Sequence, residues 1–296
     1  MQLSQIQYFL AVAEQLSFTR GAQELNVVQS AVSAGIKQLE RELGTQLFVR
    51  QGRNVRLAPA GEALLPRARA ILAEVDGARD AVDAVGGMVR GTVSLRTLSY
   101  LGALDIGKVL LEIHRRYPEV VVKLRLTVEG TRTSLAAVQE GTLNLALLSV
   151  SNPQVAGIAL HEIHTEPMVL VIPAGHRLAG RQQVDLSEIA GEQYVDFPEG
   201  WGNRTTIDSA FSAQGLHRSV RTEVVSLDFA LELVRQELGV AFLPQSTVER
   251  SGTQGIWAVP VPLKWRIQLA RATNRQPTAT EDVVMRAILA EARNAI

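Results

Sequence analysis

Two different side-chain patterns lie on one predicted helix in the stretch QSAVSAGIKQLERELGTQLFVRQGRNVRL, residues 29–57. Apolar residues recur along it at spacings of four, three and four, and small polar or basic residues recur on a second stripe about 140° around the helix axis. Glycine follows at residue 44, where a left-handed helix end costs least. We therefore predict an amphipathic helix with one packed face and one exposed face. Its apolar stripe is Val32, Ile36, Leu39 and Leu43, and its polar stripe is Ser30, Ser33, Lys37 and Arg41.

Two shorter helices are predicted before this one. Ser4 and Gln7 form a predicted capping box for the first helix, and the second helix follows the triplet SFT. Asn26 is predicted to end the second helix before a short turn. The residues predicted to face the core are Ile6, Phe9, Leu10 and Ala13 in the first helix, and Ala22 and Leu25 in the second.

A glycine-centred hairpin, LFVRQGRNVRL, is predicted directly after the third helix. It carries Arg50, Arg53 and Arg56, with no acidic side chain among them. Two helices joined by a short turn and followed by a hairpin are typical of a winged helix-turn-helix, whose second motif helix enters the major groove of DNA. The alternative for the third helix alone is an ordinary solvated amphipathic helix. The predicted DNA-contacting residues are Gln29, Ser30, Ser33, Lys37, Arg41, Arg50 and Arg53.

The segment Phe9–Leu72 resembles the DNA-binding segment of LysR-type transcriptional regulators. The resemblance rests on the spacing of SFT, QSAVS, QLE, LG, LF.R and AG, where the dot is any residue. Two positions depart from the family pattern, which commonly has alanine where Gly21 stands and serine where Val28 stands. Gly21 is expected to cost roughly 1 kcal/mol of helix preference relative to alanine. Val28 is expected to remove an N-cap side chain and a phosphate contact, so that DNA binding depends more on Gln29, Ser30 and Ser33.

A heptad repeat of apolar residues follows in residues 59–87. A lone helix of this kind gains little stability in water, and a heptad stripe is typical of pairing with a second helix. We predict a linker helix that joins two copies of the chain, so that two DNA-binding domains address a two-fold symmetric site. Packing on its own domain is the alternative. Gly86 and Gly87 are predicted to end this helix, and its stripe is Leu64, Ala68, Ile71, Val75, Ala78, Val82 and Val85.

Strand and helix patterns alternate after residue 88, which predicts α/β layers around mostly parallel sheets. One helix is expected from about Ala103 to Arg116, and another after WGNRTT. Two separate late strands are expected at GIWAVPV and WRIQLAR, before a closing helix capped by Thr280.

The resemblance implies that this part is a two-lobed effector domain similar to periplasmic binding proteins. The chain is expected to cross between the lobes near residues 149–161 and 263–268. The predicted organisation is a winged helix-turn-helix domain over residues 1–58, a dimerising linker helix over 59–87, and an effector-binding domain over 88–296, with lobe I at about 88–155 and 267–296 and lobe II at about 156–266.

Polar and aromatic residues follow several predicted strands, at the sheet edge where α/β proteins bind ligands. Tyr100 is expected to precede one helix N-terminus, and Thr131 and Ser134 open another helix whose free amides favour an anion. Taken singly, each of these residues is better explained by turn or cap chemistry. Together they resemble the family's effector cleft, and the predicted effector-binding residues are Thr97, Ser99, Tyr100, Thr131, Phe197, Trp201, Asn203 and Ser226.

Helix amides and neutral hydroxyls around one cleft favour a small organic anion, and Phe197 and Trp201 offer flat apolar surface to its body. No cofactor is expected besides this small-molecule co-inducer. The partners implied by the resemblance are double-stranded promoter DNA, a second copy through the linker helix, a tetramer through the effector domain, and RNA polymerase.

The composition of the chain argues against several other classes of protein. The chain has no cysteine, which excludes disulfides and thiolate metal sites, and its thirty basic and thirty acidic residues cancel, so a nucleic-acid surface must be local. No apolar run approaches the roughly 20 residues of a membrane span, and the first residues lack the pattern of a signal peptide, so a cytoplasmic protein is expected.

Enzyme motifs are absent from the sequence, which has no G-x-S-x-G, P-loop, G-x-G-x-x-G or H-E-x-x-H. His161 and His164 in HEIH could suggest a metal site, but residues three apart on a strand point to opposite faces, so no metal is expected. We expect a DNA-binding regulator and no enzyme. The alternative is a cytoplasmic α/β solute-binding or enzymatic protein with an incidental helix-turn-helix.

Overall fold

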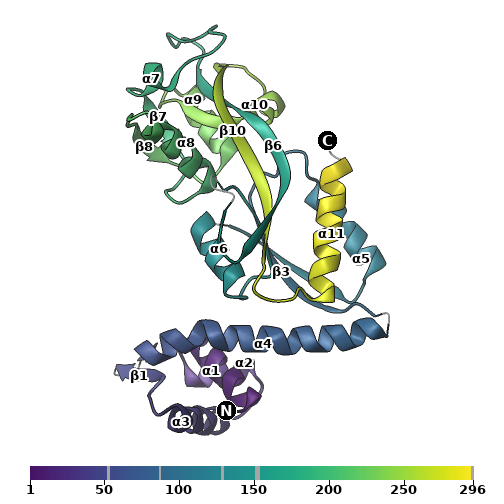
Figure 1. Cartoon of the computed structure of the whole chain (residues 1–296). Coiled ribbons are helices and arrows are strands. Elements are labelled where there is room, and N and C mark those ends of the chain that lie inside the picture. The colour runs from purple at the N-terminus through teal and green to yellow at the C-terminus, as the bar shows by residue number, and fades with distance from the viewer. Residues whose placement is uncertain (52–53, 87, 128–129, 151–153, 295–296) are drawn as a thin grey trace. The chain divides into compact units, whose positions relative to one another are not determined.

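The computed structural model describes residues 1–51, 54–86, 88–127, 130–150 and 154–294 (Figure 1). The chain divides into two compact units, one formed by Met1–Gly91 with Glu140–Thr142 and Pro277–Ala279, and one built from Thr92–Gln139, Leu143–Gln276 and Thr280–Ile296. The first unit contains α1 (Leu3–Gln15), α2 (Phe18–Glu24), α3 (Gln29–Leu43), β1 (Phe48–Gln51), β2 (Asn54–Leu57) and α4 (Pro59–Val85).

Three short helices and a hairpin form the first unit in the order predicted for a winged helix-turn-helix. β1 and β2 pair antiparallel, with Phe48 opposite Leu57. A single apolar core joins the helices, the hairpin and the start of α4. Its most deeply buried side chains include Ile6, Phe9, Ile36, Leu39 and Leu47.

Local capping explains where α2 and α3 begin or end. α2 begins at Phe18, inside the triplet SFT and not after it as predicted, because the Ser17 hydroxyl accepts a hydrogen bond from the Arg20 amide at 3.3 Å and caps the helix there. Asn26 has a φ of 54° just after α2, as expected of a residue that stops a helix. Gly44 ends α3 with a φ of 68°, which confirms the predicted glycine cap.

The predicted capping box of the first helix is wrong by two residues. α1 begins at Leu3, so Gln2 is the N-cap, and its side chain and that of Gln5 form the reciprocal pair of contacts. Ser4 and Gln7 lie inside the helix, where their amides already belong to the first turns.

Two glycines allow close approach of backbone segments in this unit. A Cβ atom at Gly21 would lie 3.0 Å from backbone atoms of Ala11 and Val12, so crowding between α1 and α2 would oppose the helix preference of alanine there. A Cβ atom at Gly61 would lie 2.1 Å from the Leu47 carbonyl oxygen. The glycine of the AG motif is therefore required where the hairpin meets α4.

The first half of α4 packs within its own unit. Ala68 is fully buried in the core, and Leu64 and Leu72 pack against the same core. Ala68 is therefore not available to a second helix, which corrects the predicted stripe at that position, and Leu64 is only partly available. Ala78 and Val82 are exposed, Val82 by 73%. The helix ends at Val85 before Gly86, as predicted, and Gly87 lies outside the described residues.

The second unit alternates strands and helices. Its strands are β3 (Gly91–Thr97), β4 (Val120–Leu126), β5 (Leu145–Leu148), β6 (Ile158–Pro173), β7 (Gln193–Asp196), β8 (Ser219–Glu223), β9 (Ala241–Pro244) and β10 (Ile256–Ala272). Its helices are α5 (Ile106–Arg116), α6 (Thr131–Gln139), α7 (Leu186–Ile189), α8 (Gly202–Ala213), α9 (Leu227–Arg235), α10 (Gln245–Ser251) and α11 (Ala279–Asn294).

One mixed sheet runs through the second unit, with the strand order β4-β3-β5-β10-β6-β9 among the described residues. β3 and β5 are parallel, as are β7 and β8 of a separate pair. β10 is antiparallel to both β5 and β6, and β6 is antiparallel to β9. The expectation of mostly parallel sheets is therefore wrong for the long strands at the centre.

The two long strands β6 and β10 lie side by side along the second unit (Figure 1). The two predicted late strands are one continuous strand, β10, with register shifts between Pro260 and Lys264 and between Ile267 and Gln268. We use lobe I for the part that contains β3, β4, β5, α5, α6 and α11, and lobe II for the part that contains β7, β8, β9 and α7–α10. Paired strands and not loops thus carry the chain between the lobes.

Three helices begin at residues other than those predicted. α5 begins at Ile106, because the Asp105 carboxylate accepts from the Lys108 amide at 3.0 Å and caps the helix there. α8 begins earlier than expected, at Gly202. α11 begins at Ala279, so Thr280 is a fully buried residue of the first turn and not its cap. Among the described residues, no helix is both long and apolar enough to cross a membrane.

Candidate DNA-contact helix and effector cavity

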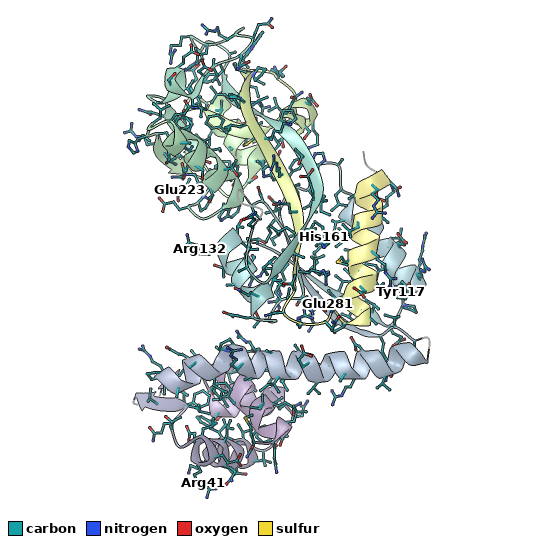
Figure 2. All side chains as sticks on the ribbon, in the orientation of Figure 1. Arg41, Tyr117, Arg132, His161, Glu223 and Glu281 are labelled. Atoms are coloured by element: carbon teal, nitrogen blue, oxygen red, sulfur yellow. The ribbon has the colours of Figure 1, made fainter. Side chains whose placement is uncertain are left out.

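The two stripes of α3 separate as predicted at all but one position. Val32, Ile36 and Leu39 are buried, whereas Leu43 in the last turn is 43% exposed, which corrects the prediction for that residue. On the other face Gln29, Ser30, Lys37 and Arg41 are exposed and Ser33 is partly exposed. Figure 2 shows Arg41 at the outer side of α3.

Contacts along the exposed stripe link neighbouring turns of α3. The Gln29 side-chain amide donates to the Ser33 hydroxyl at 3.1 Å, and Arg41 donates to the Gln38 side chain at 2.6 Å. Val28 is the N-cap without a side-chain capping bond and is 68% exposed, which confirms the expected loss of a cap. The first amides of α3 therefore lack a capping side chain, and amides of this kind can donate hydrogen bonds to a phosphate.

The hairpin is positioned by a residue that sequence reasoning missed. The Glu40 carboxylate on α3 accepts from the backbone amides of Leu47 at 2.8 Å and Phe48 at 3.4 Å. Glu40 belongs to the QLE motif and Leu47 and Phe48 to the LF.R motif, so their fixed separation was the signal. Arg50 lies on β1, but its side chain and all of Arg53 lie outside the described residues.

A cavity of about 140 Å³ lies in the second unit, where loops after strands meet helix starts of both lobes. Ser99, Tyr100, Thr131, Phe197, Trp201 and Asn203 of the predicted set line it. Several lining residues were not predicted, namely Leu98, Leu126, Thr127, Gly130, Ser149, Gly202, Val225, Leu227 and Trp265. None of the described lining residues carries a charge.

Two predicted residues do not line the cavity. Thr97 is buried, and its hydroxyl donates to the Leu98 carbonyl at 3.2 Å. The adjacent Leu98 lines the cavity where Thr97 was expected to. Ser226 caps α9, where its hydroxyl accepts from the Phe229 amide at 3.3 Å. For Ser226 the cap explanation is therefore the correct one.

Two helix N-termini reach the cavity, but one differs from the predicted pair. α5 starts six residues after Tyr100 and contributes no lining residue. The start of α8 at Gly202 and Asn203 lines the cavity in its place, and the Trp201 N-cap there provides no side-chain capping bond. α6 begins at Thr131, as predicted.

The polar atoms of the α6 start are already engaged. The Thr131 amide donates to the Gly200 carbonyl at 3.0 Å, and its hydroxyl donates to the Ser149 carbonyl at 3.2 Å. The Ser134 hydroxyl donates to the Gly130 carbonyl. By contrast the Thr127 hydroxyl is buried at the cavity and has no hydrogen-bond partner among the described residues. The buried Nε1 of Trp265 at the same cavity likewise has no partner among the described residues, so a ligand could satisfy both side chains.

Stacked rings form much of the cavity wall. Phe197 and Trp201 stack with centroids 6.1 Å apart and an interplanar angle of 13°. Tyr100 and Trp265 stack at 5.3 Å and 10°. Flat walls of this kind favour a flat ligand.

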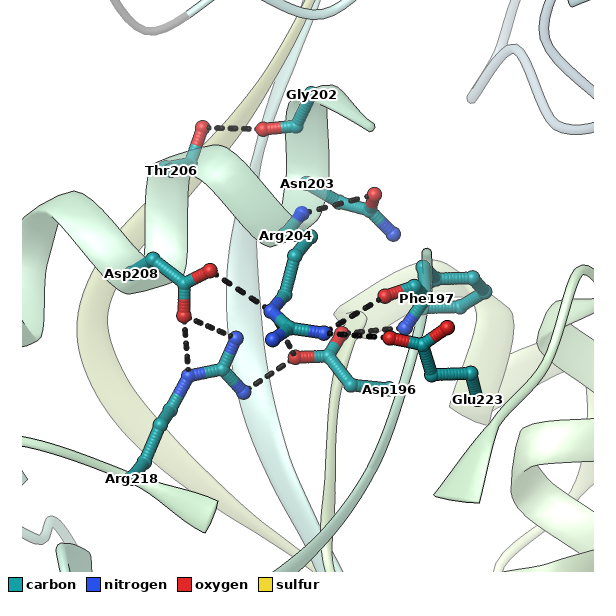
Figure 3. A network of polar contacts seen from close by, with 9 residues as sticks. All are labelled: Asp196, Phe197, Gly202, Asn203, Arg204, Thr206, Asp208, Arg218 and Glu223. Carbon is teal, nitrogen blue, oxygen red and sulfur yellow. Dashed lines mark hydrogen bonds and ion pairs between the residues drawn. The ribbon is translucent and has the colours of Figure 1, made fainter. Parts of the chain in front are cut away.

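A network of ion pairs and hydrogen bonds fixes the backbone of Phe197, which lines the cavity from lobe II (Figure 3). Asp196 accepts from the Phe197 amide at 2.7 Å, and Arg204 donates to the Phe197 carbonyl at 3.0 Å. Arg218 pairs with Asp196 and with Asp208. Burial raises the pKa of the Asp196 carboxyl above its ordinary value, and the neighbouring Arg218 guanidinium opposes that rise.

The histidines of HEIH do not form a metal site with other described residues, which contain no group of three or more potential ligands. His164 lies 3.2 Å from the Glu166 carboxylate. Burial, followed by the charge of Arg271, lowers the pKa of His161.

Family comparisons agree with this architecture. The LysR substrate binding domain matches residues 86–293, and the bacterial regulatory helix-turn-helix protein, lysR family, matches residues 3–62. The chain belongs to the LysR family of transcriptional regulators. This LysR-type regulator thus combines a DNA-binding helix-turn-helix with an effector-binding domain.

Individual relatives cover most of this LysR-type regulator. The HTH-type transcriptional regulator ShiR of Corynebacterium glutamicum is 34% identical over 83% of the chain and 84% of its own length. A probable hydrogen peroxide-inducible genes activator of Streptomyces viridosporus is 33% identical over 92% of the chain and 88% of its own length. A full-length OxyR variant from Pseudomonas aeruginosa has the same fold, with a TM-score of 0.73 and 23% identity over 98% of both chains.

Replacing Arg218 by methionine should destabilise the second unit by about 3 kcal/mol, because it removes the nearer ion-pair partner of the buried Asp196 carboxylate and leaves only Arg204, at 3.7 Å. The loss should shrink as the pH is lowered, since a protonated Asp196 carries no charge. Urea unfolding followed by tryptophan fluorescence measures both effects. Arg221→Met, at an exposed position of β8, is the control and should change stability by less than about 0.5 kcal/mol. Equal losses in the two variants would contradict the role given to Arg218.

Proposed function

We propose that this regulator reads promoter DNA with the exposed first turns of α3 and binds the phosphate backbone with its hairpin. The observation that carries the proposal is the division of α3 into a buried apolar stripe and an exposed polar stripe beside that hairpin. Small polar side chains such as Ser33 fit close to base edges, while arginines bind phosphates without regard to sequence. Contact with RNA polymerase is the proposed route from bound DNA to transcription.

Replacing Ser33 or Gln29 by alanine should reduce discrimination between operator and random DNA, since a good base contact contributes about 1–3 kcal/mol. Replacing Arg50 or Arg53 by alanine should weaken binding to every sequence and flatten the salt dependence by about one unit per lost phosphate contact. Fluorescence anisotropy on a selected operator and on a scrambled duplex, at several salt concentrations, separates the two effects. If Ser33→Ala and Arg50→Ala weakened both duplexes alike, the assigned roles would be wrong.

We further propose that the exposed second half of α4 pairs two copies of the regulator. Ala78 and Val82 are apolar and exposed, while the first half of the stripe packs within its own unit. Pairing along Val75, Ala78 and Val82 would bury this surface and place two DNA-binding domains on one site. A tetramer through the effector domain remains part of this proposal.

Introducing aspartate at Val75 and Val82 together should dissociate dimers of a fragment of residues 1–87, because it would bury unpaired charge at the helix pair. Light scattering at micromolar concentration measures the mass. Ala73→Asp lies about 160° around the helix from Val75 and should leave the mass unchanged. A dimeric mass for the double variant would show that this stripe does not pair two chains.

We infer that the effector is a small flat organic molecule with one anionic group. The stacked rings of both lobes favour a flat apolar body. The Thr127 hydroxyl of lobe I, the Nε1 of Trp265 on β10 and the amides at the start of α8 in lobe II are groups available to a carboxylate. Because no described lining residue is charged, these neutral donors would supply the whole polar contact.

The absence of cysteine favours noncovalent effector binding over redox sensing. One relative is named as a hydrogen peroxide-inducible activator. This chain contains no cysteine, so thiol chemistry with peroxide is not open to it. We infer that the protein works by binding and not by catalysis, and that it acts in the cytoplasm, where bacterial DNA lies.

Benzoate should raise the melting temperature of the full chain more than cyclohexanecarboxylate or benzamide at equal concentration, because only benzoate combines a flat body with a carboxylate. A ligand at 100 times its Kd would add about 2.7 kcal/mol of stability. Thr127→Val should remove most of the benzoate effect. Val225→Ala, at an exposed apolar position of the wall, should keep the preference for the carboxylate. An equal benzoate response in Thr127→Val and the parent would exclude Thr127 from the binding site.

A further inference from the structure

Tyr100 is held on several sides where it borders the cavity. Its ring stacks on Trp265, and the Arg250 guanidinium lies 5.0 Å from the ring centroid. Only 9% of Tyr100 is exposed. Burial raises the pKa of the Tyr100 hydroxyl, so this group stays protonated and remains a hydrogen-bond donor.

The Tyr100 hydroxyl meets two residues that do not line the cavity. It lies within hydrogen-bond distance of the Ser246 hydroxyl of α10 and, at 3.4 Å, of the Glu166 carboxylate of β6, and its single proton can be donated to one of them at a time. Tyr100 comes from lobe I and Ser246 from lobe II. A side chain on the cavity wall of one lobe is therefore bonded to the other lobe.

Glu166 is the centre of this cluster and is only 7% exposed. One carboxylate oxygen lies 3.4 Å from the Tyr100 hydroxyl and 3.2 Å from Nε2 of His164. The other accepts from the Ser246 amide at 3.1 Å and from the Ser246 hydroxyl. A carboxylate has about four lone-pair sites, and four polar groups surround this one. Such polar surroundings are what permit a carboxylate to stay buried.

A second bond between the lobes lies at the same cavity. The Thr131 amide at the start of α6 donates to the Gly200 carbonyl of lobe II at 3.0 Å. Gly130, Thr131 and Tyr100 all line the cavity. The cavity is thus bordered by two links between the lobes, one through side chains at Glu166 and one through the backbone at Thr131.

We infer that Glu166 is a positioning residue, which fixes Tyr100 on the cavity wall and, through Ser246, holds the two lobes in one relative arrangement. A molecule that contacts Tyr100 or Trp265 would touch the same residues that join the lobes, so its binding would bias their arrangement. The inference rests on the proposed function only in naming that cavity as the effector site.

The test is hydrogen–deuterium exchange of the full chain, resolved to single residues, without any ligand. The readout is the Thr131 amide, which bonds to none of the substituted residues. Tyr100→Phe keeps the ring but removes the hydroxyl, and Glu166→Gln keeps the shape but removes the charge. Each should speed exchange at Thr131 about tenfold or more, because hydrogen bonds to a buried charged group hold the lobes together. Ser246→Ala should do the same, and Ser246→Thr should restore the parent rate.

Tyr194→Phe is the matched control. Tyr194 is also buried, also stacks on an aromatic ring, and donates to the Ile189 carbonyl at 2.6 Å within lobe II alone. It should leave exchange at Thr131 unchanged. Exchange at Leu147, in the core of lobe I, should stay at the parent rate in every variant.

Unchanged exchange at Thr131 in Tyr100→Phe and Glu166→Gln would overturn the inference. Equal acceleration at Thr131 and Leu147 would overturn it as well, since it would indicate general destabilisation. Should Glu166→Gln not fold, Tyr100→Phe decides alone. Because no ligand is added, failure to find an effector leaves this result intact, and the two proposals fail separately.

Discussion

The second unit depends on the pairing of β6 with β10. The pairing extends from Ile158 opposite Ala272 to Pro173 opposite Ile256. β5 joins the β10 side at one end, and β9 joins the β6 side at the other. The β6–β10 pair is therefore a two-stranded ribbon shared by both lobes. Each lobe adds its own strand to this ribbon, β5 in lobe I and β9 in lobe II, so the sheet of each lobe depends on it. Trp265, which borders the cavity, and Glu166, which bonds across the lobes, both lie on this ribbon.

Sequence reasoning succeeded for the first unit because its signals are local. The stripes of α3 and the helix ends at Asn26 and Gly44 depend on residues within a few positions of one another. The central pairing of the second unit joins residues about a hundred positions apart, and no periodicity shows that. Pro260 and Pro262 also interrupt the β10 pattern, so one strand with a register shift looked like two.

The cavity was predicted in outline and missed in detail for related reasons. Ser99, Phe197 and Trp201 could be found because they follow strands at the sheet edge. Thr97 was misplaced because neighbouring residues at a strand end face opposite ways, and a shift of one residue exchanges them. Trp265 and Thr127 had no sequence signal, since the first lies within a long strand and the second is distinguished only by its missing hydrogen-bond partner.

The unbroken passage of β6 and β10 between the lobes also limits how the length of the chain can change. Inserting one residue in a regularly paired stretch of either strand, with no bulge to accommodate it, would shift the pairing beyond it by one position and turn every following side chain to the opposite face. Leu170 of β6 and Leu243 of β9 are fully buried, so such a shift would expose core side chains in one lobe while the other stayed intact. Sequence length should therefore vary in the turns around Gly175 and Gly180, where added atoms meet open space, and not along the ribbon.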